Sequence, residues 1–158
     1  MGRHVGKPDL MPPHQFLFLR ANPICTGEGK LTPTGLHWEY RTSPSPLSRE
    51  YVVRIEFERG NIPRVMIKEP DIELLAQGRE LPHIYHDPTR LCLYLPKSQE
   101  WAGWMRIDQT FVPWTAIWLY YFEEWLVSGE WKGGGEHPSA DDDEKPNRHV
   151  RRASNRCW

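Results

Sequence analysis

The chain is organised around residues 81–101, which read LPHIYHDPTRLCLYLPKSQEW. At the centre is Cys92, in the middle of the apolar run 91–95. Two histidines, His83 and His86, precede this cysteine by nine and six residues. Two prolines stiffen the approach to it, because proline fixes its own φ and restricts the residue before it. This arrangement predicts a catalytic cysteine presented beside a rigid loop.

The chemistry of Cys92 allows three interpretations. A thiolate is a strong nucleophile, so an accessible cysteine needs little help to form a thioester. The oxyanion of that reaction needs a hydrogen-bond donor, which His83 or His86 can supply, and Asp87 can orient His86. Alternatively, Cys92 is a small buried hydrophobe. A metal site of the form H-x2-H-x5-C is the third interpretation, but the sequence offers no convincing fourth ligand nearby.

The direction of the Cys92 side chain follows from the alternation of an extended chain. Within 91–95 the three leucines share one face, and Cys92 shares the other with Tyr94. We expect the leucines to face the core and the thiol to face outward. A shift of one residue in register reverses this assignment.

Upstream of this stretch, three segments alternate between apolar and polar residues. They are 36–41, 51–59 and 64–68, and a Gly-Asn pair typical of a hairpin turn separates the second from the third. Short connections between successive strands favour an antiparallel meander. With 91–95 as a fourth strand, the sequence predicts an α+β fold: a four-stranded antiparallel meander covered by a central helix.

Residues 114–127 predict that central helix, because they contain no glycine or proline and are apolar on most sides. Pro113 suits the first position of a helix. A shorter helix is predicted at 15–21 and a helical turn at 71–77, whereas 23–34 is expected to be a loop. The aromatic stripe of the central helix predicts core packing rather than a cofactor site; it consists of Trp114, Ile117, Trp118, Tyr121 and Trp125.

Composition limits the classes of protein that the chain can be. Its 158 residues suffice for one domain, and its net charge of −1 gives no electrostatic basis for binding nucleic acid or an acidic membrane. No apolar run reaches the roughly 18 residues of a membrane span. Three widely spaced cysteines are not a disulfide framework and favour a reducing compartment. We therefore expect a cytoplasmic protein, with no cofactor and no metal.

The expected organisation is one domain between two polar ends. Residues 1–14 are expected to be loose and lack the apolar core of a signal peptide. The folded domain is expected to span 15–132. The tail, 133–158, has an acidic run followed by a basic one, which predicts disorder, either as a solvated tail or as a docking segment.

The stretch around Cys92 resembles the active-site region of ubiquitin-conjugating enzymes. Residues 81–85 resemble the His-Pro-Asn-Ile-Tyr segment of that family, and 91–93 resemble its Ile-Cys-Leu segment. Residues 97–101 resemble the run that ends in the family tryptophan. The predicted meander and the proline-initiated helix are similar to the family's sheet and central helix, so the resemblance covers roughly 34–128.

Departures from the family pattern indicate a bacterial member. Leu81 stands where the family has histidine, and His83 stands where it has the asparagine that stabilises the oxyanion. The gap from His83 to Cys92 is one residue longer, some ten extra residues precede Pro113, and the later helices of eukaryotic members have no expected counterpart. The segments PSPLSREY, HIY, LCLY, EW, VPW and GGGEHP are similar to those of compact conjugating-enzyme-like proteins in bacterial antiphage operons, the CBASS systems.

The resemblance implies a thioester-forming transferase of truncated ubiquitin-conjugating fold. Cys92 would accept the C-terminus of a cGAS-like nucleotidyltransferase, or of a ubiquitin-like modifier, and pass it to an amine. His83 would donate to the oxyanion, and His86 or Asp87 would assist the acceptor or orient the loop. Two alternatives stay open: a catalytically inactive binding scaffold, and a cysteine hydrolase that removes a modifier with the help of His86 and Asp87. Cys25 is taken to be structural.

Overall fold

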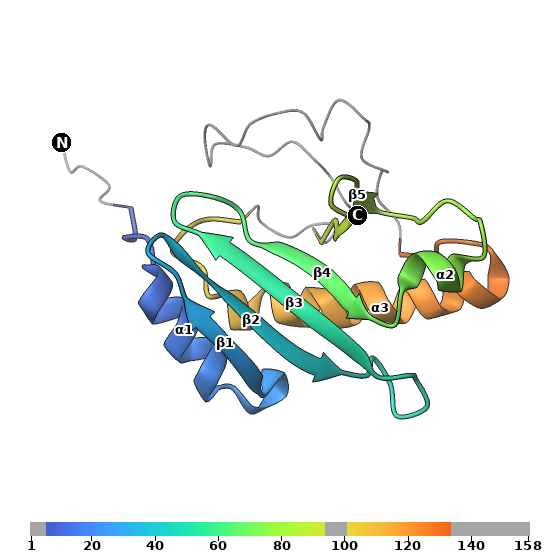
Figure 1. Cartoon of the computed structure of the whole chain (residues 1–158), viewed down its shortest axis with the longest axis horizontal. Coiled ribbons are helices and arrows are strands. Elements are labelled where there is room, and N and C mark those ends of the chain that lie inside the picture. Colours follow the sequence, from blue (N-terminus) through green and yellow to red (C-terminus); the bar gives the residue numbers. More distant parts are fainter. Residues whose placement is uncertain (1–5, 94–100, 134–158) are drawn as a thin grey trace.

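The computed structural model describes residues 6–93 and 101–133. In the described residues a four-stranded antiparallel sheet lies across a long helix (Figure 1), which confirms the α+β class. The elements in chain order are α1 (Pro12–Ala21), the 3-10 turn η1 (Pro23–Cys25), β1 (Gly27–Leu31), β2 (Gly35–Thr42), β3 (Tyr51–Glu58), β4 (Arg64–Glu69), α2 (Ile72–Ala76), β5 (Ile84–Tyr85), β6 (Arg90–Leu91), the 3-10 turn η2 (Ile107–Gln109) and α3 (Phe111–Ser128).

The sheet has the spatial order β1-β2-β3-β4, with every pair antiparallel. Near the middle of the sheet, Trp38 lies opposite Ile55, which lies opposite Val65, and the register of β3 with β4 shifts between Val52 and Val53. The predicted alternation is confirmed in β2 and β3, because every second residue is buried and the residues between them are not. The buried residues of these two strands are Leu36, Trp38, Tyr40, Tyr51, Val53, Ile55 and Phe57.

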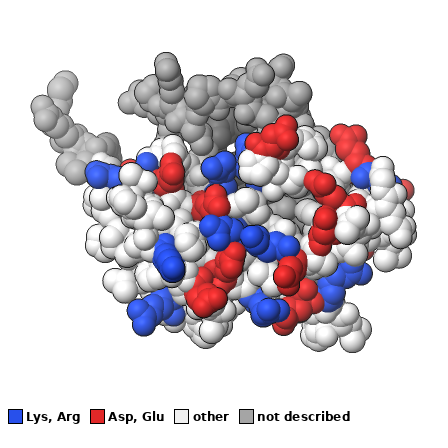
Figure 2. Space-filling view, in the orientation of Figure 1, with Lys and Arg blue, Asp and Glu red and all other residues white. Residues whose placement is uncertain are grey.

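The outer face of the sheet carries the polar half of the alternation. Arg54 on β3 donates to Glu39 on β2 at 3.1 Å and to Glu56 on its own strand at 2.9 Å. Figure 2 shows both signs of charge interspersed on this side of the molecule. The charged residues alternate with apolar ones because successive side chains of a strand point to opposite faces and only the inner face is buried.

The predicted fourth strand of the meander is wrong. The fourth strand of the sheet is β1, in the segment expected to be a loop. Of residues 91–93, the part of the apolar run that the structure describes, Leu91 alone lies in a strand, β6, which belongs to a separate two-stranded sheet. β1 is an edge strand and mostly exposed, so it has no apolar alternation to signal it. The glycines of this segment also favoured a loop. Gly27 instead allows the backbones of β1 and β2 to approach each other closely, since a Cβ on Gly27 would collide with the Glu39 carbonyl oxygen.

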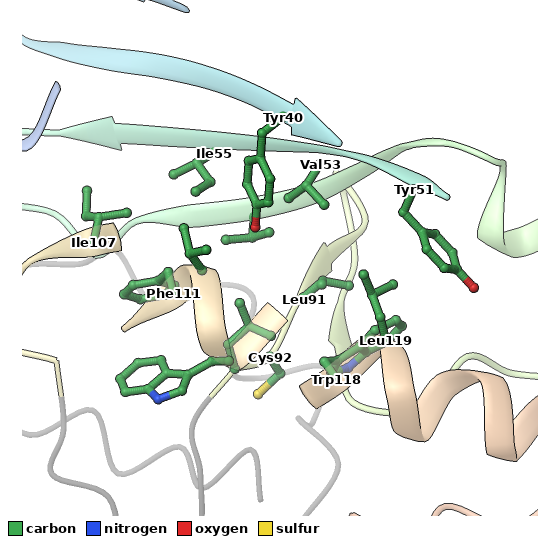
Figure 3. Close-up of a cluster of buried hydrophobic side chains, with 14 of the residues drawn as sticks. Tyr40, Tyr51, Val53, Ile55, Leu91, Cys92, Ile107, Phe111, Trp118 and Leu119 are labelled. Atoms are coloured by element: carbon green, nitrogen blue, oxygen red, sulfur yellow. The ribbon is translucent and has the colours of Figure 1, made fainter. Parts of the chain in front are cut away.

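Helix α3 covers the inner face of the sheet (Figures 1 and 3). It begins at Phe111, two residues before Pro113, and the missing N–H of this proline falls among the first-turn donors that have no partner in any helix. Gly129 ends the helix in the left-handed conformation, with its N–H donating to the Trp125 carbonyl at 2.8 Å. The buried face consists of Phe111, Val112, Trp114, Thr115, Trp118, Leu119, Phe122 and Trp125.

The predicted aromatic stripe is therefore only partly the core face of α3. Trp114, Trp118 and Trp125 are buried, but Ile117 and Tyr121 are half-buried. The periodicity of the sequence predicted the helix and its burial. A helix that is apolar on most sides does not reveal which of its sides packs against the sheet.

The N-terminal helix and the helical turn are both confirmed. α1 begins at Pro12, three residues before the expected start, and contacts β1, β2 and η2. α2 lies within the predicted 71–77, and the Asp71 carboxylate caps its N-terminus by accepting the N–H of Glu73 at 2.9 Å. The expected tail lies outside the described residues except for Gly133, and so do residues 1–5 of the expected loose end.

The buried side chain of Gln15 joins α1 to the loop before α3 through two hydrogen bonds. Its amide nitrogen donates to the Met105 carbonyl at 2.7 Å, and its amide oxygen accepts the Ile107 N–H at 3.0 Å. A further hydrogen bond joins the same two regions, since Asn22 donates to the buried Asp108 carboxylate at 3.0 Å. Polar side chains therefore hold α1 against the connection that leads into α3.

We expect Gln15→Ala to lower the free energy of unfolding by about 2 kcal/mol, because it leaves a buried N–H and a buried carbonyl without partners. Urea denaturation followed by tryptophan fluorescence measures this change. Leu17→Ala on the same helix is the matched control: Leu17 is 59% exposed, and its truncation should shift stability by no more than about 0.5 kcal/mol. Equal decreases in the free energy of unfolding of the two variants would contradict the stabilising role of the Gln15 hydrogen bonds.

Candidate active site

The short hairpin of β5 and β6 positions Cys92. Ile84 pairs with Leu91, and Tyr85 pairs with Arg90. The next position outward brings His83 opposite Cys92, and the Cys92 backbone N–H donates to the His83 carbonyl at 3.0 Å. Residues opposite each other on antiparallel strands have Cβ atoms about 5 Å apart. The hairpin thus makes cross-strand neighbours of two residues that are nine positions apart in sequence.

The expectation that Cys92 faces outward is wrong. Cys92 is 1% exposed, and its neighbours Leu91 and Leu93 are buried as well. Figure 3 shows Cys92 at the edge of the buried apolar cluster, with its sulfur pointing away from the sheet. Alternation separates a core face from a solvent face only where one face meets water, and this segment is buried on both.

The Cys92 sulfur is disulfide-bonded in this structure. The three widely spaced cysteines predict no disulfide framework, and a single bond at Cys92 does not make one. Any reaction of Cys92 as a nucleophile begins from the reduced thiol, because the thiolate is the attacking species.

His83 is the most constrained residue of the site. It is 1% exposed, and its backbone lies in the left-handed region at φ +46°. Its carbonyl accepts a second hydrogen bond, from the indole N–H of Trp118 on α3, at 3.0 Å. Its ring lies 4.9 Å from the ring of Trp131, with an angle of 31° between the planes. Asparagine and histidine are among the residues that tolerate the left-handed region best, so the backbone here suits either residue.

Trp118 and Trp131 are site residues that sequence reasoning missed. Trp118 was predicted only as part of a core stripe, and Trp131 was not singled out. Both reach His83 from the C-terminal part of the chain, and Trp118 is 35 positions away from it. No local pattern reports a contact at that separation, so only the packing of α3 beside the hairpin reveals it.

His86 and Asp87 lie at the other end of the hairpin. Both are exposed, and the register puts them three and four positions beyond His83, away from Cys92. Asp87 has φ +51°, as the tight turn requires. Arg90 holds this turn by donating to the His86 carbonyl at 3.1 Å, and it stacks over the Tyr85 ring at 4.9 Å. The structure brings His83 next to Cys92 but leaves His86 and Asp87 at the rim of the hairpin, the exposed turn that joins β5 and β6.

Trp101, the tryptophan downstream of Cys92, is buried in the core. Its ring packs edge-on against Phe111 at 5.2 Å and against Phe57 at 6.4 Å between ring centres. It is therefore fixed to both α3 and β3, at the point where the described chain resumes after residue 93.

Cys25 lies far from this hairpin and is chemically unlike a nucleophile. It is fully buried, and its thiol lies 3.4 Å from the Leu19 carbonyl that accepts its hydrogen bond. Burial, with a smaller contribution from the negative charge of Asp108, raises the pKa of the Cys25 thiol to about 11. Both features describe a packing residue.

We expect Cys25 to resist alkylation in the folded protein at pH 8. The raised pKa keeps the thiol protonated there, and a shift of the pKa from 9.0 to about 11 reduces the thiolate fraction about 100-fold. Iodoacetamide labelling after reduction, located by peptide mass spectrometry, measures the rate in native buffer and in urea. Labelling should accelerate as the pH rises toward 11. Equal rates in the folded and unfolded protein at pH 8 would contradict this assignment.

Within residues 6–93 and 101–133, no three His, Cys, Asp or Glu side chains are grouped as a metal site would need. In the same residues, no helix combines the length and apolar character of a membrane span.

Two comparisons with known proteins bear on the site. A family model described as type II CBASS E2 protein matches residues 15–138, which include the sheet, the hairpin with Cys92 and the whole of α3. A comparison with curated proteins gave no match.

Proposed function

We propose a function from one premise: the chain belongs to the family of type II CBASS E2 proteins. Membership gives it an E2-like role in CBASS antiphage defence. Within that role we propose that the chain has the ubiquitin-conjugating fold in truncated form, and that it acts in the cytoplasm as a thioester-forming acyl transferase with Cys92 as its nucleophile.

The observation that carries the proposal is the hydrogen bond from the Cys92 N–H to the His83 carbonyl. It fixes the backbone of a cysteine beside a histidine, which is the pairing of nucleophile and donor that acyl transfer uses. The hairpin that holds them lies on the rigid core rather than on a free loop, because Leu91 and Ile84 are both buried.

The reaction has two steps. The Cys92 thiolate attacks the activated C-terminal carbonyl of a partner, expels the activating group and forms a thioester. A neutral amine then attacks the thioester carbonyl, a C–N bond forms and the C–S bond breaks. The thiolate leaves, and the proton lost by the nitrogen passes to the thiolate or to water, so that an amide and a free Cys92 remain. The acyl group must arrive activated, as an adenylate or a thioester, because a free carboxylate does not acylate a thiol.

We propose the C-terminus of a cGAS-like nucleotidyltransferase as the acyl group, with a ubiquitin-like modifier as the alternative. His83 would donate a hydrogen bond to the oxyanion in both steps. The exposed positions of His86 and Asp87 suit them to the approach of the acceptor amine at the rim of the hairpin.

One observation favours a second function, that of a binding scaffold. Cys92 is buried and disulfide-bonded, and a catalytic sulfur must be reduced and reachable by its partner. A scaffold would use the same fold to hold a partner without covalent chemistry.

We expect the wild-type chain, purified from its host with a tag, to carry a partner through a thioester that Cys92→Ala lacks. Intact-mass spectrometry identifies the adduct. Phosphine reductant distinguishes the two bonds that Cys92 can form, because it cleaves a disulfide and leaves a thioester, whereas neutral hydroxylamine cleaves the thioester. Cys92→Ser is the matched variant, and we expect it to form a more stable oxyester.

A partner retained equally by wild type and Cys92→Ala, with no covalent mass, would replace the transferase with the scaffold. An adduct that persists in Cys92→Ala would show that another residue carries it.

We expect His83→Ala to slow transfer on the order of 10²-fold, because it removes the oxyanion donor. His83→Asn should retain most of the rate, since asparagine both donates a hydrogen bond and tolerates the left-handed backbone. Single-turnover decay of the Cys92 thioester measures both rates. His86→Ala is the control at the hairpin rim and should affect the rate less than His83→Ala. Equal rates for wild type and His83→Ala would leave His83 with a structural role only.

A further inference from the structure

We propose that Trp118 is a positioning residue for Cys92, acting through the carbonyl of His83. The inference deepens the proposed transfer at Cys92 and rests on it. Trp118 would not touch the reacting atoms; it would hold the backbone on which the nucleophile and its neighbouring histidine depend.

The His83 carbonyl accepts hydrogen bonds from two parts of the chain. It accepts the Cys92 backbone N–H at 3.0 Å and the Trp118 indole N–H at 3.0 Å, which uses both lone pairs of the oxygen. The first donor belongs to the hairpin and the second to α3. Through this one oxygen, the segment that carries Cys92 is fixed to the longest helix of the described chain.

Trp118 is itself held rigidly. It is fully buried, and its ring stacks on Phe122 with centres 5.1 Å apart and planes 17° from parallel. A tryptophan packed in this way has no freedom to follow a moving loop. The Trp118 indole N–H therefore has a fixed position, and the hydrogen bond that it donates fixes the position of the His83 carbonyl.

The backbone of His83 needs such a fixed point. A residue with a Cβ in the left-handed region carries a conformational cost, and it keeps that conformation only where surrounding contacts enforce it. If the indole N–H is removed, the peptide plane after His83 can rotate, and the hydrogen bond from Cys92 is lost with it. The position of Cys92 relative to His83 then loosens.

A second contact links Trp118 to the same histidine. The chain turns back after Gly129, and the ring of Trp131 lies 4.9 Å from the His83 ring and 5.8 Å from the Trp118 ring. The same part of the chain thus contacts His83 on its backbone and on its side chain.

The sequence supplies a matched control for this bond. Trp38 is also buried, and its indole N–H donates to a backbone carbonyl, that of Cys25, at the same distance of 3.0 Å. Trp38→Phe and Trp118→Phe each remove one buried indole N–H from a backbone carbonyl. Only the second change touches the carbonyl that holds Cys92.

The experiment compares these two variants with wild type by thermal unfolding, by alkylation of reduced Cys92 and by single-turnover transfer. We expect both variants to melt lower by similar amounts. Trp118→Phe alone should transfer about 10-fold more slowly, with an unchanged half-saturating partner concentration, while Cys92 is alkylated several-fold faster because its surroundings have loosened. Opposite changes in the two rates are the signature of lost positioning, since a general loss of stability would affect both variants alike.

Equal transfer and alkylation rates in Trp118→Phe and Trp38→Phe would overturn the inference. If Trp118→Phe does not fold, Trp131→Leu removes the half-buried ring that contacts the rings of both His83 and Trp118, and it should give the same signature. The absence of that signature in Trp131→Leu would also overturn the inference. A wild-type chain that forms no adduct would refute the transferase instead. In that case the alkylation rates still decide whether Trp118 positions Cys92.

Discussion

The structure depends on covering the inner face of the sheet. Strands β2 and β3 present large side chains to one side only, and removing a side chain of this size from water contributes roughly 1.5–3 kcal/mol. Helix α3 supplies the opposing surface with aromatic rings, of which Trp118 and Phe122 stack on each other. Every other described element is placed relative to this interface: α1 beside β1 and β2, and the β5–β6 hairpin between β4 and α3.

Burial on this scale forces the polar groups near the interface into specific pairs. Gln15 uses both ends of its amide, Asp108 accepts from Asn22 and Arg106, and the His83 carbonyl accepts two donors. A buried polar group without a partner costs free energy, so these bonds select one arrangement among the many that would bury the same apolar area. The loop before α3 and the hairpin of Cys92 are two of the places that such bonds fix, and the second is the candidate active site.

The site joins two opposed requirements. A nucleophile must be reached by a partner, yet its backbone must be held to a fraction of an ångström for catalysis. Here the chain favours the second requirement: the cysteine, its histidine neighbour and the indole that joins them to α3 are all buried.

Sequence alone determined the elements whose side chains alternate or recur around one interface. These are β2, β3, β4 and α3, together with Cys92 and His83 as the candidate pair, because period and local motif are written in consecutive residues. It missed β1, an exposed glycine-containing edge strand with no apolar face. It also misjudged the exposure of Cys92, since alternation does not distinguish core from solvent in a segment that is buried on both sides. Only the tertiary structure decided that Trp118 meets His83 and that His86 stays at the rim. Contacts between residues far apart in the chain are set by how α3 crosses the sheet, and no short stretch of sequence contains that information.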